Sequence, residues 1–176
     1  SSIDAKKFWH MDSGIQLKSI GKFSSSFYRI EKPEKKINFL EYYNPTLLLE
    51  LNLPLYKKEN GRVDLIEPVL QLIYNPDMSS NDVLPNEDSQ QIKLDQTSLF
   101  SFNRFSGLDK QEYGLRLNSG LKYSVENNGP FSYDLAMGQV FRKGDSMQFS
   151  EGSGLSGVKS NILIAANIDY KNNIKI

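Results

Sequence analysis

The chain has 176 residues, and its 21 Lys and Arg balance its 21 Asp and Glu. A net charge of zero argues against nucleic-acid binding through bulk electrostatics, so no nucleic-acid partner is expected. The lack of cysteine excludes disulfides, zinc–thiolate sites and a cysteine nucleophile. With His10 as the only histidine and no nucleophile–base pair in sight, we expect no enzyme, no catalytic residue, no metal site and no cofactor. No apolar run is long enough for a membrane-spanning helix.

Apolar and polar residues alternate along the chain with a period of two, the pattern of strands that bury one face. In the clearest early case, leucines occupy every second position from Leu47 to Leu55, whereas an amphipathic helix needs spacings of three and four. A turn signal at Asp12–Gly14 precedes the first strand, and a charged loop is expected at 31–38. The expected strands cover residues 15–27, 45–56, 62–74, 113–125, 131–142 and 160–170.

The strand at 113–125 has the strongest pattern. Leu115, Leu117 and Leu121 lie on one face between Tyr113 and Tyr123, and the opposite face is polar. At about 3.3 Å per residue the segment can cross a bilayer when tilted, and aromatic residues at both ends of an apolar band are typical of outer-membrane strands. The pattern predicts that Leu117 faces lipid. It also predicts that Asn118 faces water, where a change to Arg should be tolerated.

The connections between the expected strands alternate in length. Short turns at 57–61 and 126–130 alternate with long loops at 75–109 and 143–157. In outer-membrane barrels the short turns are periplasmic and the long loops extracellular, whereas a soluble sandwich needs no such parity. We therefore predict an all-β chain, an antiparallel meander of about six long strands. Residues 1–176 would be a single segment of a transmembrane β-barrel, cut from a larger barrel domain.

Charged and amide side chains mark the polar face of these strands. In a soluble sheet they would be the wet face, and in a barrel they would line the lumen and pair across strands. Arg116, Lys122 and Arg142 would either offer hydrogen bonds to the phosphates of a ligand or pair with acids such as Asp134. The lumen-facing candidates are Glu50, Glu67, Gln71, Arg116, Asn118, Lys122, Asp134, Arg142 and Asp169.

Several segments resemble the LptD family, formerly called organic solvent tolerance proteins. The similar segments are 66–74, 84–89 and 99–109, with further similarity at Gly114–Arg116 and Gly152–Leu155. The resemblance covers about residues 45–170 in order and spacing. The most specific piece is the loop motif made of Asn103, Arg104, Phe105, Ser106, Gly107 and Asp109.

The resemblance implies a large barrel in the cell outer membrane of a Gram-negative bacterium. Such a barrel receives lipopolysaccharide from a periplasmic domain, holds the plug lipoprotein LptE, and inserts lipid into the outer leaflet through a lateral opening. Against that family, we expect residues 1–176 to include neither the periplasmic jelly-roll domain nor the closing strand, and they contain none of the cysteines of many members. Two alternatives stay open at this point: a soluble antiparallel β-sandwich module that binds lipid or carbohydrate, and an outer-membrane lipid-modifying enzyme.

Overall fold

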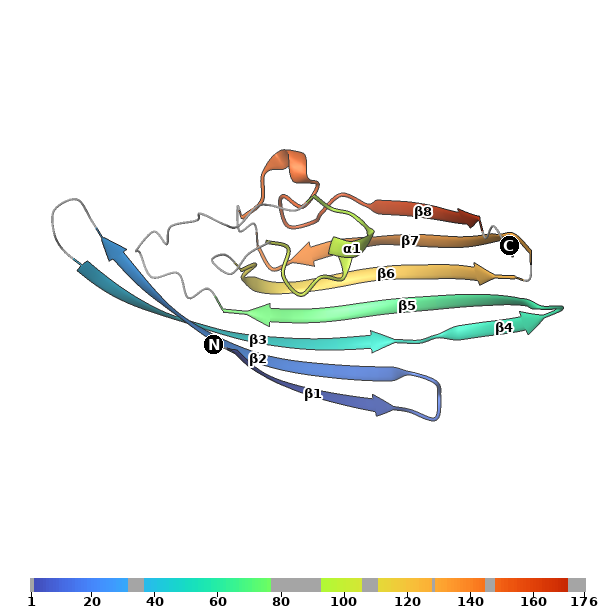
Figure 1. Cartoon of the computed structure of the whole chain (residues 1–176), viewed down its shortest axis with the longest axis horizontal. Helices are drawn as coiled ribbons and strands as arrows, with labels where there is room; N and C mark the ends of the chain where they lie inside the picture. The colour runs from blue at the N-terminus through green and yellow to red at the C-terminus, as the bar shows by residue number, and fades with distance from the viewer. Residues whose placement is uncertain are drawn as a thin grey trace, which may run out of the picture.

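A single antiparallel sheet contains all the strands that the structure describes (Figure 1). The computed structural model describes residues 2–31, 37–76, 93–105, 111–127, 129–144 and 148–170. Within them, eight strand segments are ordered β1-β2-β3-β5-β6-β7-β8, and β4 pairs with β5. The predicted all-β meander is thereby confirmed. The strands are β1 (Ser2–His10), β2 (Gln16–Glu31), β3 (Ile37–Asn52), β4 (Leu55–Glu59), β5 (Arg62–Asn75), β6 (Gly114–Glu126), β7 (Phe131–Arg142) and β8 (Leu163–Tyr170).

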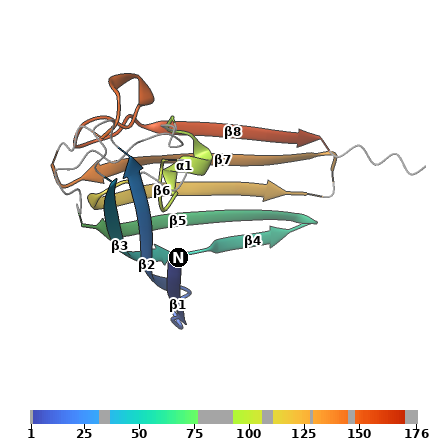
Figure 2. The ribbon, with the colours of Figure 1, turned by 60° about the vertical axis from the view of Figure 1, so that its left-hand side comes forward.

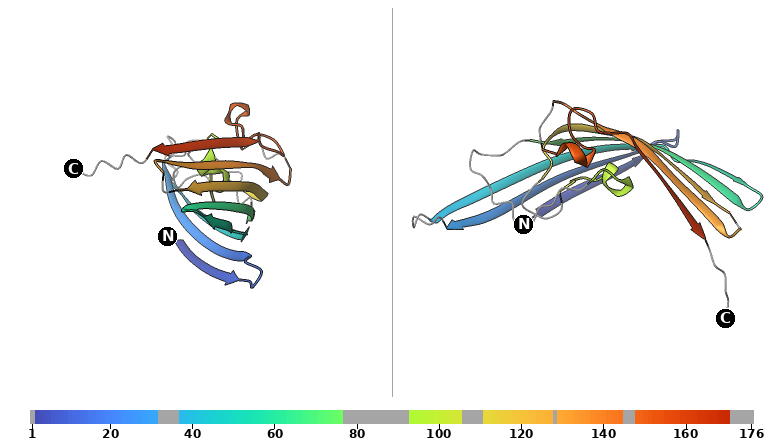
Figure 3. Two further views of the ribbon diagram at one scale, coloured as in Figure 1. Left: turned by 90° about the vertical axis from the view of Figure 1, so that its right-hand side faces the viewer. Right: turned by 90° about the horizontal axis from the view of Figure 1, so that it is seen from above.

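Two short helices lie in the long connections. The helix α1 (Gln96–Leu99) precedes β6, and the 3-10 helix η1 (Glu151–Ser153) precedes β8. The sheet is curved, and both helices lie on its concave side (Figures 2 and 3). No helix in the described part of the chain has the length and apolar character needed to cross a membrane.

The two faces of the sheet differ in chemistry, as the alternation predicts. Register places Leu49 opposite Leu72 and Leu72 opposite Leu117 on the convex face, and all three side chains are exposed. Exposed aromatic residues lie on this face, with Trp9, Tyr133 and Tyr170 near the short turns and Tyr74 beside the long connection after β5. Phe23 and Tyr43 stack on each other midway along β2 and β3. The concave face carries the polar residues and the helices.

The structure also has strands that the alternation does not reveal. In β1 the register turns Phe8 to the concave face and Lys7 to the convex face, so the two faces are not separated by polarity. The expected turn at 57–61 is shorter, because β4 continues to Glu59. Only Asn60 and Gly61 form the turn, and both have positive φ, at 49° and 78°. Two such residues make the tight turn that matches the twist of a hairpin.

Candidate functional site

A cap of two loop segments, residues 93–105 and 148–160, packs on the concave face. Leu99, Phe105, Phe149 and Leu155 are buried with Val140 of β7 in one apolar cluster. The rings of Phe105 and Phe149 stack with their centroids 4.9 Å apart. The Leu94 N–H donates to the Ser153 carbonyl at 3.0 Å. The two segments of the loop cap therefore form one packed unit.

The loop cap contacts the sheet at a pair of glycines, which we call the glycine seat. Gly120 of β6 lies directly opposite Gly138 of β7. A Cβ atom on Gly138 would lie 2.6 Å from Leu99 Cδ2, and one on Gly120 would lie 2.6 Å from Phe100 Cζ. The carbonyl oxygens of Met137 and Ser119 on the neighbouring strands would lie equally close to these Cβ atoms. Because atoms cannot approach that closely, both the strand pairing and the contacts of Leu99 and Phe100 require positions without side chains.

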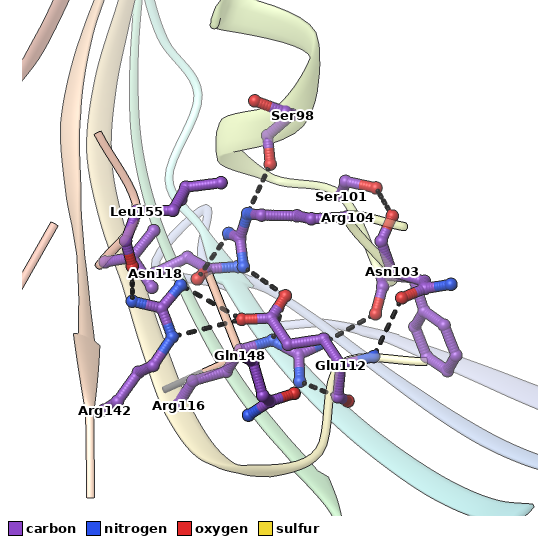
Figure 4. A network of polar contacts seen from close by, with 12 residues as sticks. Ser98, Ser101, Asn103, Arg104, Glu112, Arg116, Asn118, Arg142, Gln148 and Leu155 are labelled. Atoms are coloured by element: carbon purple, nitrogen blue, oxygen red, sulfur yellow. Dashed lines mark hydrogen bonds and ion pairs between the residues drawn. The ribbon is translucent and has the colours of Figure 1, made fainter. Parts of the chain in front are cut away.

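Beneath the loop cap, three arginines surround one carboxylate (Figure 4). Arg104 Nη1 donates to Glu112 Oε2 at 2.8 Å, and Arg142 Nη2 donates to Oε1 at 3.1 Å. Arg116 Nε lies 3.5 Å from Oε2. The exposed fraction is 1% for Glu112 and 7% or less for each arginine. We call these four residues the Glu112 cluster.

Each arginine of the Glu112 cluster also fixes main-chain carbonyls. Free carbonyls in a buried loop are costly unless a donor satisfies them, and guanidinium offers five N–H donors in a fixed plane. The acceptors are the carbonyls of Ser98 and Leu99 for Arg104, those of Phe102 and Glu112 for Arg116, and those of Leu155 and Gly157 for Arg142. The cluster therefore links both segments of the loop cap to β6 and β7.

The electrostatics of the cluster favour an ionised Glu112. Burial by itself raises the pKa of the Glu112 carboxyl, but the positive charges of Arg116, Arg104 and Arg142 outweigh it and hold that pKa below its usual value. Burial lowers the pKa of Arg104, and the charge of Glu112 opposes that shift. One carboxylate thus serves three guanidinium groups, and removing it would leave buried charge without a counter-ion.

A chain of polar contacts runs from the Glu112 cluster across the concave face. Arg104 Nη2 donates to Asn118 Oδ1 at 2.9 Å, and Asn118 Nδ2 donates to Gln71 Oε1 at 3.0 Å. Gln71 Nε2 donates to Glu50, whose other oxygen lies 3.5 Å from Lys18 Nζ. The contacts connect the loop cap with β6, β5, β3 and β2.

Register places all nine sequence-predicted candidates on the concave face, but their surroundings differ. Gln71, Arg116, Asn118 and Arg142 are buried, and the last three meet at the Glu112 cluster or beside it. The side chains that are not fully buried are Glu50, Glu67, Lys122, Asp134 and Asp169. Lys122 Nζ lies 5.0 Å from the centre of the Phe100 ring.

Two expectations about these residues are wrong. Asn118 is fully buried and hydrogen-bonded to both Arg104 and Gln71, so it does not face water, and we now expect an Arg there to be disruptive. Arg116 and Arg142 are buried and already bonded, so they do not offer free donors to a phosphate. Their acidic partner is Glu112 and not Asp134. The reason is the same in both cases, because the loop cap folds back over this part of the polar face.

The loop motif contributes three described residues to the site. Arg104 and Phe105 are buried, and Asn103 Oδ1 accepts from the Glu112 N–H at 2.9 Å and from the Phe105 N–H at 3.3 Å. Through these two hydrogen bonds, the Asn103 side chain links the backbone at Phe105 to the backbone at Glu112. The remaining motif residues, Ser106, Gly107 and Asp109, lie outside the described residues. Glu112 itself was missed, since nothing in the sequence distinguishes it from other loop acids.

Comparison with known proteins agrees with the fold and the motif. The family model for LptD, described as LPS transport system D, matches residues 9–176. The matched range contains every strand from β2 onward and both segments of the loop cap. It confirms the resemblance expected from the loop motif and its neighbours. No curated protein matches the chain.

Proposed function

Because the chain belongs to the LptD family, we propose that it forms part of the wall and the extracellular loops of an outer-membrane translocon. The family is a lipopolysaccharide transport family of the Gram-negative outer membrane, and its work is transport and not enzymatic catalysis. In this proposal the translocon inserts lipopolysaccharide into the outer leaflet. Its partners are lipopolysaccharide, the plug lipoprotein LptE, the remaining barrel strands and a periplasmic domain.

The observation that carries this proposal is the contrast between the two faces of one curved sheet. Large apolar side chains on the convex face are exposed, including Leu47, Ile66 and Ile164. A soluble β-sandwich would bury such a face against a second sheet, whereas a barrel wall presents it to lipid between two aromatic girdles. The contrast therefore favours the barrel over the sandwich.

The concave face would then line the lumen, with the loop cap seated on it. We assign Arg104, Glu112, Arg116 and Arg142 to holding the loop cap, because they are buried and bonded to one another and to its carbonyls. The lumen-facing residues left to meet cargo or LptE are those at the margin of the loop cap and beyond it. They include Glu67, Lys122, Asp134 and Asp169.

Leu117→Arg is expected to reduce the folded fraction of the native protein in membranes, because a cation on the lipid face costs about 2–4 kcal/mol near the bilayer midplane and less toward the interfaces. The matched control is Ser124→Arg on the same strand, because Ser124 lines a hollow of about 710 Å³ on the concave face together with Glu126 and Asp134. Heat-modifiable gel mobility measures the folded fraction. Equal loss in both variants would contradict the assignment of faces.

Sidedness provides a second test. We expect an impermeant thiol reagent to label Glu151→Cys in whole cells, because this exposed residue lies in a loop proposed to be extracellular. Glu59→Cys, also at an exposed position and beside a short turn, should be labelled only after the outer membrane is permeabilised. The chain has no cysteine of its own, so the signal comes from the introduced residue alone. Labelling of Glu59→Cys but not Glu151→Cys in intact cells would overturn the proposed orientation.

A further inference from the structure

The convex face carries a groove along β6, β7 and β8. Two hollows, of about 430 Å³ and 310 Å³, lie next to each other and share Tyr123 and Leu135 as lining residues, and we call them together the groove. Its depth has a simple cause, since Leu135 of β7 lies opposite Ala166 of β8 and the short Ala166 side chain leaves space beside it. The groove lies on the face opposite to the loop cap and shares no residue with the Glu112 cluster.

The two ends of the groove differ in chemistry. The end toward the middle of the sheet is walled by Leu121, Met137 and Ile164 and is almost entirely apolar. The other end reaches the short turns, where Arg62 and Asn127 join the wall. From Leu121 to Val125 the groove runs about 13 Å at 3.3 Å per residue. That length is close to half of the roughly 30 Å hydrocarbon core of a bilayer.

A charge pair stands at the polar end. Arg62 donates through Nε and Nη2 to the carboxylate of Asp64, and the Tyr123 hydroxyl donates to the same carboxylate at 2.6 Å. The Arg62 side chain is 54% exposed. Within the described part of the chain, the bonds of the Arg62 guanidinium are made through Nε and Nη2, and Nη1 donates to no protein acceptor. The pair thus presents a free guanidinium donor beside a carboxylate, with no net charge.

We propose that this groove binds one zwitterionic phospholipid, and the proposal rests on the convex face being the lipid-facing face. One acyl chain lies along the apolar walls, the phosphate accepts from Arg62 Nη1, and the headgroup ammonium approaches Asp64. A charged donor to phosphate is a strong hydrogen bond. A purely anionic headgroup should bind less tightly than a zwitterionic one, because Asp64 already neutralises the charge of Arg62 and repels a second negative charge.

Native mass spectrometry tests the site in the detergent-purified native protein, incubated with equal amounts of phosphatidylethanolamine and phosphatidylglycerol of the same acyl chains. We expect one retained phosphatidylethanolamine, in clear excess over phosphatidylglycerol. Arg62→Gln should weaken its retention about tenfold, and Ala166→Trp should abolish it by filling the groove. The matched controls are Lys7→Gln and Ala5→Trp, which lie on the same convex face on β1, away from the groove.

The possible outcomes distinguish a failure of the lipid site from a failure of the proposed function. Preference for phosphatidylglycerol, or undiminished retention in Arg62→Gln and Ala166→Trp, would overturn the lipid site. So would loss of retention in the two controls to the same degree as in the groove variants. If thiol labelling gives the expected sidedness while no phospholipid is retained, the site is wrong and the translocon proposal stands.

Discussion

Glu112→Gln is expected to release the loop cap from the concave face. The change removes the carboxylate that serves Arg104, Arg116 and Arg142, all of them buried. Breaking a buried ion pair by removing one partner costs about 3–5 kcal/mol. Because the backbone pairing of the strands does not depend on Glu112, the loss should be confined to the loop cap. Hydrogen exchange of the native protein should show faster exchange in segments 94–105 and 148–155.

The matched control is Glu151→Gln, an identical change at an exposed position of the same loop cap. It should leave exchange unchanged, because an exposed charge contributes little to stability. Fast exchange in both variants would show that any charge loss loosens the loops. Unchanged exchange in Glu112→Gln would show that apolar packing alone holds them, and would remove the role given to the Glu112 cluster.

The pH dependence of exchange gives the same cluster a second readout. Glu112 has a lowered pKa in the folded loop cap, so its ionised form stabilises the docked loops above the unfolded value of about 4.3. That contribution is lost as the pH falls through the lower folded value. The protection factors of the loop-cap amides, which compare the measured exchange rate with the intrinsic rate at the same pH, should therefore be high at neutral pH and fall in acid, and Glu112→Gln should lose most of this dependence.

Gly138→Ala is the second change with a large expected effect. Its Cβ would lie 2.6 Å from Leu99 Cδ2 and 2.6 Å from the Ser119 carbonyl oxygen. Overpacking of this kind costs about 1–3 kcal/mol. The loop cap can move to relieve the Leu99 clash, whereas the Ser119 oxygen belongs to the backbone of β6, so its clash also strains the pairing of β6 with β7. We expect faster exchange around α1, measured as for Glu112→Gln, together with some loss of protection at the β6–β7 pairs beside Gly138.

Gly21→Ala is the control, since a Cβ there would meet only Leu47 Cδ2 at an ordinary 3.7 Å. Combining Gly138→Ala with Leu99→Ala separates the two clashes. The double variant removes the Leu99 side chain but keeps the contact with the Ser119 carbonyl oxygen. Slow exchange around α1 in Gly138→Ala alone would contradict the glycine seat. If the double variant restores protection at the β6–β7 pairs, the clash with Leu99 is the more important one, and if the loss persists, the clash with the Ser119 carbonyl oxygen is.

The sequence by itself determined most of the strands and their faces, but not β1, β4 or the extent of β2 and β3, which end at Glu31 and begin at Ile37 within the segment expected to be a charged loop. Residues 131–142 alternate cleanly, and β7 occupies just those residues, while β6 begins one residue later than expected. Side chains on a strand point alternately to opposite faces, so a period of two is readable wherever the faces differ in polarity. It fails in β1, where charged and aromatic residues lie on both faces. The LptD resemblance likewise came from the loop motif, in which Arg104 belongs to the site.

Only the tertiary structure decided which polar residues are buried. The alternation places Asn118 and Lys122 on the same face and does not distinguish between them. In the structure Asn118 is fully buried, whereas Lys122 lies at the margin of the loop cap. Glu112 gathers partners 8 residues before it and 4 and 30 residues after it, at Arg104, Arg116 and Arg142. Local periodicity follows from the geometry of one strand. Burial of charge depends instead on where two distant loops fold back, because only close approach in space removes water and supplies counter-ions.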